Sequence, residues 1–323
     1  MSTGPMAVIL AAGKSTRMKS ALPKVLHQVC GRPMIEYVLD AARSASVTRL
    51  VAIIGHRSEL VRGELSKHPD VEFAVQAEQK GTGHALMMCR DQLQSHQGAV
   101  LVLAGDTPLI KQESLTRLLK TLEEQQASCV IGTAITEANF GLGRVIRDGR
   151  GNFVKIVEEK DASAEEKLVR EINTGCYVFD ARSLLSSLDQ IRPNNSQAEY
   201  YLTDCPRVMK DAGQRVVALE AFDMVEALGV NTREQLAEVT RTLQQAAMSQ
   251  WMVNGTTIVS PENTFIDPQV SIGADTVIEP FTHISGAVTI GDNCRIGPHA
   301  VIEGPLTVSA GSIVKPFQHL SGR

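Results

Sequence analysis

A cluster of cations follows the first apolar run of the chain. The sequence VILAAGKSTRMKSALPK carries positive charge at Lys14, Arg17, Lys19 and Lys24, directly after the small residues of LAAG. Small residues let backbone N–H groups approach a ligand closely, and exposed N–H groups beside cations suit an anionic phosphate. Arginine donates to two phosphate oxygens at once, whereas lysine supplies a point charge. The segment therefore predicts a phosphate-binding loop, with a charged surface loop as the alternative.

Part of this loop, Gly13-Lys14-Ser15, looks like the end of an ATP-binding P-loop. That motif has the form G-x-x-x-x-G-K-[ST], and Val8 occupies the position that its first glycine would need. The P-loop interpretation therefore fails. What remains is a strand, a small-residue turn and a cation cluster, which suit a nucleotide used for another chemistry.

A second segment, VQAEQKGTGHA, follows an apolar run and enters a helix-like stretch. The side-chain amides of Gln76 and Gln79 both donate and accept, so they can read the edge of a base. Gly81 lets the backbone lie against a flat ring. The segment predicts a base pocket; as an alternative, Thr82 only caps a helix that begins at Gly83.

A third segment, VLVLAGDTPLI, ends its apolar run at Asp106. A carboxylate there can bind Mg²⁺, which favours oxygen ligands and keeps water and substrate phosphates in its shell. The alternative is a turn cap in the DTPL sequence. Because no second acidic cluster lies nearby in the sequence, the metal must share its shell with the nucleotide or with a distant residue.

These segments require a sheet that brings the ends of their strands together. From Ala7 to about Ala104, short apolar runs alternate with helix-like segments, which predicts βαβ units and a parallel sheet covered by helices on both faces. Ligands of such sheets bind beyond the carboxyl ends of the strands, so the three segments should face one site. After a helix at residues 112–124, the strand SCVIGTAIT should extend the sheet.

Residues 141–180 depart from this alternation. The sequence GRVIRDGRGNFVKIVEE predicts a hairpin that turns at residues 148–151, and REINTGCYVF predicts a further strand. We interpret this segment as an insertion or sheet extension that covers the site.

The C-terminal part of the chain has a six-residue period. A helix is expected over 232–252, where apolar residues recur near helical spacing without Gly or Pro. Nine β-branched residues then recur at every sixth position: Ile266, Ile272, Ile278, Ile284, Ile290, Ile296, Ile302, Val308 and Val314. This period is typical of a hexapeptide parallel β-helix of about three coils; a β-sandwich would alternate with period two instead.

Composition excludes several classes of partner. The formal net charge of −4 gives no basic field, so neither duplex nucleic acid nor an anionic membrane is expected as a partner. The six cysteines form no C-x-x-C pair, which argues against a zinc ribbon or a disulfide framework and predicts reduced, mostly buried thiols. The N-terminus lacks a signal-peptide pattern and no apolar run approaches 18 residues, so we expect a cytoplasmic protein.

The motifs LAAGKSTRM with LPK, QAEQKGTGHA, GDTPLI, VEEKDAS, EINTG, NNSQAEYYLTD and GVNTREQL occur in this order. Together they closely resemble the N-acetylglucosamine-1-phosphate uridylyltransferases over about residues 6–320. The resemblance implies an α/β fold: a Rossmann-like nucleotidyltransferase domain with a mixed sheet at 1–231, a connecting helix at 232–252 and a short left-handed parallel β-helix at 253–323. The family's β-helix also implies a homotrimer.

The resemblance implies a role for each motif residue. Those at the nucleotide phosphates are Leu10, Ala11, Ala12 and Gly13, with Lys14 as a contact of lesser weight. Arg17 is implied on the leaving pyrophosphate and Lys24 near the transferred phosphate. The uracil and ribose contacts are Gln76, Gln79, Gly81 and Thr82. The Mg²⁺ ligands are Asp106 and Asn231. The amino-sugar contacts are Gly143, Glu158 and Asn173.

These roles agree with the chemistry of joining UTP to a sugar 1-phosphate. One anion attacks another, so Mg²⁺, Lys24 and Arg17 must neutralise charge. A phosphate monoester is largely ionised at pH 7, so no general base is needed, and we interpret His84 as a packing or helix residue. Without the resemblance, Glu158 would be a surface carboxylate, and Asn173 and Asn231 ordinary turn residues.

The chain also departs from the family's pattern. Leu142 stands between two glycines where an aromatic residue is typical, and Ala104 stands where a tyrosine is frequent. Bifunctional members continue for more coils that carry their acetyltransferase residues, so we expect that activity to be absent. The alternatives are another sugar 1-phosphate, dTTP in place of UTP, or a non-catalytic hexapeptide scaffold with a vestigial nucleotide domain. One methyl on the base is worth only about 1–3 kcal/mol of discrimination.

Overall fold

The computed structural model describes residues 4–322, so the predicted domain ends at residues 1 and 323 lie outside it. The chain divides into two compact units. The first comprises the residues up to His27 together with Pro33–Thr232, and the second comprises Gln28–Arg32 together with the residues from Arg233 onward. Each unit is described by itself.

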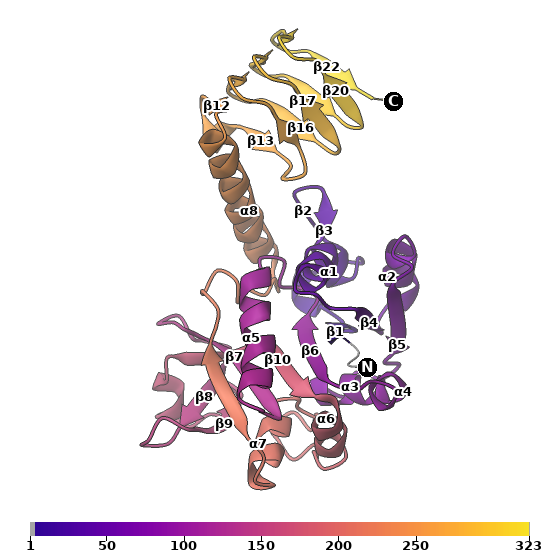
Figure 1. The fold of residues 1–323 in the computed structure, drawn as a ribbon, viewed down its shortest axis with the longest axis vertical. Coiled ribbons are helices and arrows are strands. Elements are labelled where there is room, and N and C mark those ends of the chain that lie inside the picture. Colours follow the sequence, from indigo (N-terminus) through magenta and orange to yellow (C-terminus); the bar gives the residue numbers. More distant parts are fainter. Residues whose placement is uncertain (1–3, 323) are drawn as a thin grey trace. The chain divides into compact units, whose positions relative to one another are not determined.

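A mixed sheet forms the centre of the first unit (Figure 1). Its strands lie in the order β11-β7-β10-β6-β1-β4-β5, and the pairing is parallel except along β10, which is antiparallel to both β6 and β7. Their bounds are Met6–Ala11 (β1), Arg49–Ile54 (β4), Val71–Val75 (β5), Ala99–Ala104 (β6), Cys129–Ile135 (β7), Glu171–Asp180 (β10) and Val216–Glu220 (β11). The predicted Rossmann-like fold with a mixed sheet is confirmed.

Helices cover both faces of this sheet, because alternate residues of each strand are buried on opposite sides. Ile9 of β1 packs in a cluster with α1, α2 and α5, whereas Val8 packs in a second cluster with α3, α4, α6 and α7. The helices are Met34–Ser44 (α1), Ser58–Leu65 (α2), Thr82–Met87 (α3), Arg90–Gln94 (α4), Gln112–Glu124 (α5), Ala181–Leu188 (α6) and Asp204–Asp211 (α7). Short 3-10 turns lie at Thr16–Met18 (η1), Lys24–Leu26 (η2) and Glu166–Leu168 (η3).

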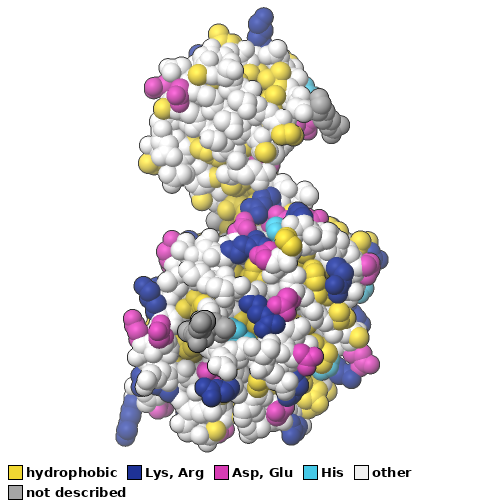
Figure 2. All heavy atoms as spheres, turned by 45° about the vertical axis from the view of Figure 1, so that its right-hand side comes forward, with side chains coloured by type: hydrophobic (Ala, Val, Ile, Leu, Met, Phe, Trp, Pro, Cys, Tyr) yellow, Lys and Arg dark blue, Asp and Glu magenta, His cyan; other side chains and the backbone are white. Residues whose placement is uncertain are grey.

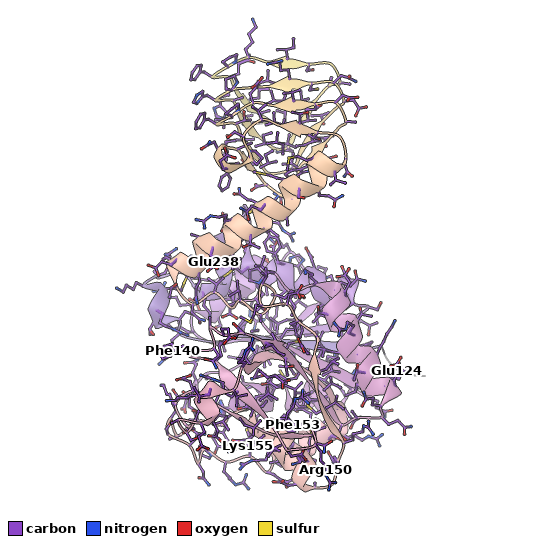
Figure 3. The ribbon with its side chains drawn as sticks, turned by 90° about the vertical axis from the view of Figure 1, so that its left-hand side faces the viewer. Glu124, Phe140, Arg150, Phe153, Lys155 and Glu238 are labelled. Atoms are coloured by element: carbon purple, nitrogen blue, oxygen red, sulfur yellow. The ribbon has the colours of Figure 1, made fainter. Side chains whose placement is uncertain are left out.

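The predicted hairpin forms from β8 (Gly143–Arg147) and β9 (Phe153–Val157), which pair antiparallel. The following strand, β10, is not an edge or a cover: it lies between β6 and β7 inside the main sheet. The interpretation of the whole 141–180 segment as a cover is therefore wrong for β10. Figure 3 labels Phe140 and Arg150, which precede and follow β8; Phe140 is 88% exposed.

The second unit consists of a long helix, a small hairpin and a β-helix. Helix α8 spans Arg233–Val253, and β2 (Gln28–Val29) pairs with β3 (Arg32–Pro33). The Cys30 thiol of this hairpin donates to the Thr240 carbonyl of α8 at 3.7 Å. The sequence contained no sign that this hairpin would join the C-terminal residues.

The β-helix has three parallel sheets, one for each face of its coils. They are ordered β12-β15-β18-β21, β13-β16-β19-β22 and β14-β17-β20. The strands are Thr257–Ile258 (β12), Phe265–Ile266 (β13), Ser271–Ile272 (β14), Val277–Ile278 (β15), His283–Ser285 (β16), Val288–Ile290 (β17), Arg295–Ile296 (β18), Val301–Glu303 (β19), Leu306–Val308 (β20), Ile313–Val314 (β21) and His319–Ser321 (β22), with a 3-10 turn at Pro261–Asn263 (η4). The aliphatic residues of the six-residue period stack inside, as in Ile266 beside Ile284 and Ile284 beside Ile302. The predicted hexapeptide β-helix is confirmed.

The surface carries both signs of charge. On the face shown in Figure 2, acidic and basic side chains intermingle over the first unit, and fewer charged side chains lie on the β-helix. Within residues 4–322, none of the helices combines the length and apolar character needed to cross a bilayer. All six cysteines are buried and unpaired, as predicted.

Candidate active site

The loop after β1 presents backbone N–H groups that the protein does not use. Among the described residues, no carbonyl or side chain accepts from the backbone N–H groups of residues 12–16. A methyl group added at Gly13 would meet nothing within 4 Å. Free donors beside open space are the features that an anion-binding loop requires.

This loop borders a cavity of about 500 Å³ in the first unit. The other walls come from the loop after β5, the end of β6 and the segment that precedes α8. The lining residues are Leu10, Ala11, Ala12, Gly13, Ser15, Thr16, Arg17, Lys24, Val25, Gln76, Gln79, Gly81, Thr82, Ala85, Ala104, Asp106, Glu199 and Asn231. Every predicted phosphate, base and metal residue except the exposed Lys14 therefore lines one cavity.

Three polar lining residues had no predicted role: Ser15, Thr16 and Glu199. Each lies inside a motif that the sequence had singled out, LAAGKSTRM or NNSQAEYYLTD. Position in a motif was thus the available signal, but residue type alone did not distinguish these side chains from their exposed neighbours.

The two predicted metal ligands lie together with the two predicted catalytic cations. Lys24 Nζ donates to Asn231 Oδ1 at 2.9 Å and forms an ion pair with the carboxylate of Asp106. Arg17 Nη2 donates to the same Asn231 oxygen at 2.8 Å. The backbone fixes this approach, since the N–H of Val230 donates to the carbonyl of Asp106 at 2.9 Å.

This pair of oxygens fits a hard divalent cation. Asp106 offers a carboxylate and Asn231 an amide oxygen, and such cations take oxygen ligands from one or two side chains plus water and phosphate. Across residues 4–322, no group of three or more His, Cys, Asp or Glu side chains is arranged to hold a metal. The remaining ligands would therefore come from a bound phosphate and from water.

The loop after β5, residues 76–82, is called the base loop. A hydrogen-bond network around Gln76, which is only 3% exposed, holds it in place. Its Nε2 donates to the carbonyl of Gly81 at 3.0 Å and lies 3.1 Å from Nδ1 of His84. Gln79 Nε2 donates to the backbone carbonyl of Gln76 at 3.1 Å. The turn is thus closed on itself before any ligand enters.

Residues 199–202 pack directly on this turn. A methyl group added at Gly81 would lie 2.5 Å from the carbonyl oxygen of Tyr200, so the two backbones touch. Helix α3 begins at Thr82 without a side-chain cap, and the Thr82 hydroxyl accepts from the N–H of Leu202 at 3.1 Å. The alternative that Thr82 only caps a helix beginning at Gly83 is therefore wrong.

The three predicted sugar residues converge outside this cavity's lining. Gly143 of β8 pairs with Asn173 of β10, and a methyl group at Gly143 would lie 3.5 Å from Oε2 of Glu158. Glu158 lines a second cavity of about 380 Å³ and accepts from the Thr203 hydroxyl at 3.3 Å. Burial raises the pKa of the Glu158 carboxyl, while the Thr203 hydrogen bond opposes this shift.

An ion pair between a buried arginine and a partly exposed glutamate supports the loop that leads into β8. Arg144 is 1% exposed, and its Nη2 lies 2.6 Å from Oε2 of Glu159. The same carboxylate oxygen accepts from the N–H of Gly141 at 3.1 Å. The guanidinium of Arg144 holds the pKa of Glu159 below its usual range. The residues ahead of Gly143 are thereby tied to Glu159, which follows β9.

Fold and site together define a nucleotidyltransferase domain. The family described as "MobA-like NTP transferase domain" matches residues 7–191, more than half of the chain, and the "Bacterial transferase hexapeptide (six repeats)" family matches residues 269–304. The chain belongs to the MobA-like NTP transferase family. Enzymes of this kind generally depend on a divalent metal.

Curated relatives match both units. "Bifunctional protein GlmU" of Brevibacillus brevis is 45% identical over 294 residues, which cover 91% of this chain and 63% of the relative. Proteins with the same name from Exiguobacterium sibiricum and Pelotomaculum thermopropionicum are 46% and 49% identical; the alignments cover 92% and 85% of this chain and 66% and 60% of the relatives. The chain thus spans less than two thirds of these relatives' length. They confirm the family resemblance inferred from the motifs.

Proposed function

We propose that this chain transfers a uridylyl group from UTP to N-acetylglucosamine 1-phosphate, with Mg²⁺ as the divalent cation. The products are UDP-N-acetylglucosamine and pyrophosphate. The observation that carries the proposal is the convergence on one cavity of free backbone donors, two cations, two metal-type oxygens and a base loop. The similarity to proteins named GlmU supports the same choice.

The reaction forms one phosphorus–oxygen bond and breaks another. An oxygen of the sugar phosphate attacks the α-phosphorus of UTP, and the bond between that phosphorus and the bridging oxygen of pyrophosphate breaks. Arg17 and Lys24 supply the positive charge that lets the two anions approach, and the free N–H groups of residues 12–16 hold the triphosphate. The attacking phosphate is largely ionised at pH 7, so no side chain has to remove a proton.

Asp106 and Asn231 would hold the Mg²⁺, which supplies further charge neutralisation to the triphosphate. In the structure Lys24 pairs with the carboxylate of Asp106, and both Lys24 and Arg17 donate to the amide oxygen of Asn231. Substrate phosphates are the competing anionic partners for both cations. Substrate entry would therefore exchange the Lys24–Asp106 ion pair for a pair between Lys24 and a phosphate, while the cation takes over the charge of Asp106.

Gly143, Glu158 and Asn173 would hold the amino sugar. The absence of a side chain at Gly143 leaves room between the other two residues, and the carboxylate of Glu158 is an acceptor for sugar hydroxyls. Leu142 lies next to Gly143, at a position where the family typically has an aromatic residue. Of the chain's departures from the family pattern, it is the one most relevant to which sugar binds.

Pyrophosphate release tests the proposal. The intact chain is incubated with Mg²⁺ and a panel that crosses UTP, dTTP, CTP, ATP and GTP with several sugar 1-phosphates. We expect the highest rate with UTP and N-acetylglucosamine 1-phosphate, and a loss of at least about a hundredfold in Asp106→Ala. Asp91→Ala, an exposed acidic residue of α4 in the same unit, is the matched control and should keep the wild-type rate.

The outcome separates the proposal from its alternatives. No pyrophosphate from any pair of substrates would favour a hexapeptide scaffold with a vestigial nucleotide domain. Faster turnover of another sugar 1-phosphate, or of dTTP, would show that the substrates differ from those proposed, while the proposed type of reaction, nucleotidyl transfer, would stand.

We also propose that the β-helix assembles three copies of the chain. An exposed aromatic stack supports this proposal: the rings of Phe281 and Phe317 each lie 4.9 Å from the ring of His299, and the two phenylalanines are 55% and 76% exposed. Apolar surface of this kind is common at contacts between proteins. Light scattering should return the mass of a trimer, and a monomer at micromolar concentration would contradict it.

A further inference from the structure

His84 is a side chain of the site region for which the proposed chemistry has no use. It lies in the first turn of α3, partly buried, with its ring centroid 6.3 Å from that of Tyr200. Its Nδ1 lies 3.1 Å from Nε2 of Gln76, the buried amide of the base loop. The interpretation of His84 as a packing residue leaves this polar contact unexplained.

Two contacts, one to the Gly81 carbonyl and one to His84, hold the Gln76 amide in one orientation. The carbonyl of Gly81 can only accept, and it takes a hydrogen bond from Gln76 Nε2 at 3.0 Å. The amide nitrogen has a second N–H, and this one faces His84 Nδ1. The ring nitrogen must therefore be an acceptor, so the imidazole is neutral and carries its proton on Nε2.

With both amide N–H groups engaged, only the oxygen of Gln76 is left for a ligand. No described residue donates to Gln76 Oε1, that oxygen is not sealed from solvent, and Gln76 lines the cavity. The backbone N–H of Gly81 likewise donates to no group among residues 4–322. Gln76 and Gly81 thus offer one fixed acceptor and one fixed donor close together.

This pattern distinguishes among pyrimidines. Uracil and thymine carry an N–H at ring position 3 and a carbonyl at position 4, which complement an acceptor and a donor. Cytosine has a lone pair at position 3 and an amino group at position 4, so it would place acceptor against acceptor and donor against donor. A site built of fixed polar groups rejects such an analogue because those groups are left unpaired.

We propose that His84 is a positioning residue for base recognition: it fixes the Gln76 amide so that the cavity selects a pyrimidine with a ring N–H, uracil or thymine, over cytosine. The inference rests on the proposed function, in that the cavity must bind a nucleoside triphosphate. His84 itself touches neither the base nor the phosphates in this scheme.

The surroundings of His84 keep its ring neutral near pH 7. Burial lowers the pKa of His84 below its ordinary value of 6.5, the charge of Lys80 lowers it further, and Glu78 opposes both. Tyr200 is a further neighbour with a titratable group, its ring centroid 6.3 Å from that of His84. Protonation of the ring would put an N–H against the amide N–H, so preference for uracil should weaken only below about pH 6.5.

Competition between UTP and CTP tests the proposal. We would measure kcat/KM for both nucleotides by pyrophosphate release, and their Kd by equilibrium titration, between pH 5.5 and 8. In His84→Leu the UTP to CTP ratio should fall about tenfold or more and lose its pH dependence, since one misdirected hydrogen bond is worth at least that factor. His84→Asn, which keeps an acceptor near the position of Nδ1, should restore part of the ratio.

A merely structural role for His84 predicts something else. It would lower binding of both nucleotides equally and leave their ratio unchanged, and that result would overturn the proposal. A wild-type protein that binds UTP and CTP equally would overturn it too. If His84→Leu fails to fold, the pH dependence of the wild-type ratio and the Asn variant still decide. Binding preference without turnover would instead contradict the proposed reaction and leave the role of His84 supported.

Discussion

Two glycines of the same cavity should respond differently to an added methyl group: one substitution should lower stability, the other nucleotide affinity. Gly81 has φ 105° and ψ 172°, a region that essentially only glycine occupies. A methyl group there would lie 2.5 Å from the carbonyl oxygen and 2.9 Å from the nitrogen of Tyr200. Both are backbone atoms, and both are held by hydrogen bonds of 2.8 Å to the base loop. Rotation of a side chain therefore cannot relieve the overlap.

Backbone strain and steric overlap together determine how much Gly81→Ala lowers the stability of the protein. Holding a non-glycine residue in this conformation costs about 1–3 kcal/mol. Overpacking against a fixed neighbour costs about 1–3 kcal/mol more. The lower bound is thus about 2 kcal/mol, which corresponds to a fall of about 4–8 °C in Tm for a unit of this size.

Gly13→Ala is the matched comparison. Its methyl group would meet no protein atom within 4 Å, and the φ angle of Gly13 is not positive. Stability should therefore stay within about 1 kcal/mol of the wild type, in the stabilising direction. The methyl group instead enters the space beside the free N–H groups, so UTP should bind about tenfold more weakly or worse.

Thermal unfolding followed by circular dichroism, together with UTP titration, measures both effects. Gly81→Ala should lower Tm, and Gly13→Ala should lower UTP affinity without lowering Tm. If the Tm of Gly81→Ala lies within 1 °C of the wild-type Tm, the base loop and residues 199–202 are not in the close contact argued above.

Three further predictions concern the rest of the molecule. Burial raises the pKa of Glu158 in the folded state, so the wild-type protein loses stability as the pH rises from 4.5 through that raised pKa. The free energy of unfolding of Glu158→Gln minus that of the wild type should therefore be more positive at pH 8 than at pH 4.5. Urea unfolding that gives equal differences at the two pH values would contradict this. Glu159→Gln leaves the buried Arg144 without its carboxylate and should lower stability, whereas the double variant with Arg144→Met should recover part of the loss. In the β-helix, Ile296→Ala should cost about 2–5 kcal/mol in denaturant unfolding, whereas Ile313→Ala, at a residue 71% exposed, should change stability by less than about 0.5 kcal/mol.

The β-helix was predictable because its rule is local. A β-branched aliphatic residue packs inward at every sixth position, so the period can be read from the chain without knowing which strands pair. The pairing then follows, since each coil repeats after 18 residues, as Ile266, Ile284 and Ile302 do. The fold of the first unit was predictable for a similar reason, because alternating strands and helices restrict the sheet to few arrangements.

The position of β10 was not predicted, although its sequence contained a hint. Cys176 and Val178 are buried on one face of the sheet, and Tyr177 and Phe179 on the other. An apolar run of this kind is typical of a central strand that is covered on both faces. Its place between β6 and β7 depends on pairings with residues far away in the chain, for which no local pattern exists.

The site residues show the same division between local and distant information. The rule that ligands bind at the carboxyl ends of parallel strands brought the loops after β1, β5 and β6 together correctly. It could not say that Asn231 would accept from both Arg17 and Lys24, more than 200 residues away. Nor could it predict that residues 199–202 would form the support for the base loop.

The two lysines that flank the β1 loop illustrate what positions a charge in this site. Lys14 directly follows Gly13, yet it is exposed and does not line the cavity. Lys24 lies ten residues further on, at the start of η2 after Pro23, and it reaches Asp106 and Asn231. Proximity in sequence to the β1 loop therefore does not decide which lysine lines the cavity. What matters is that the chain turns back: Val25 and Leu26 are buried against the sheet, and their burial holds the lysine before them at the carboxyl ends of the strands.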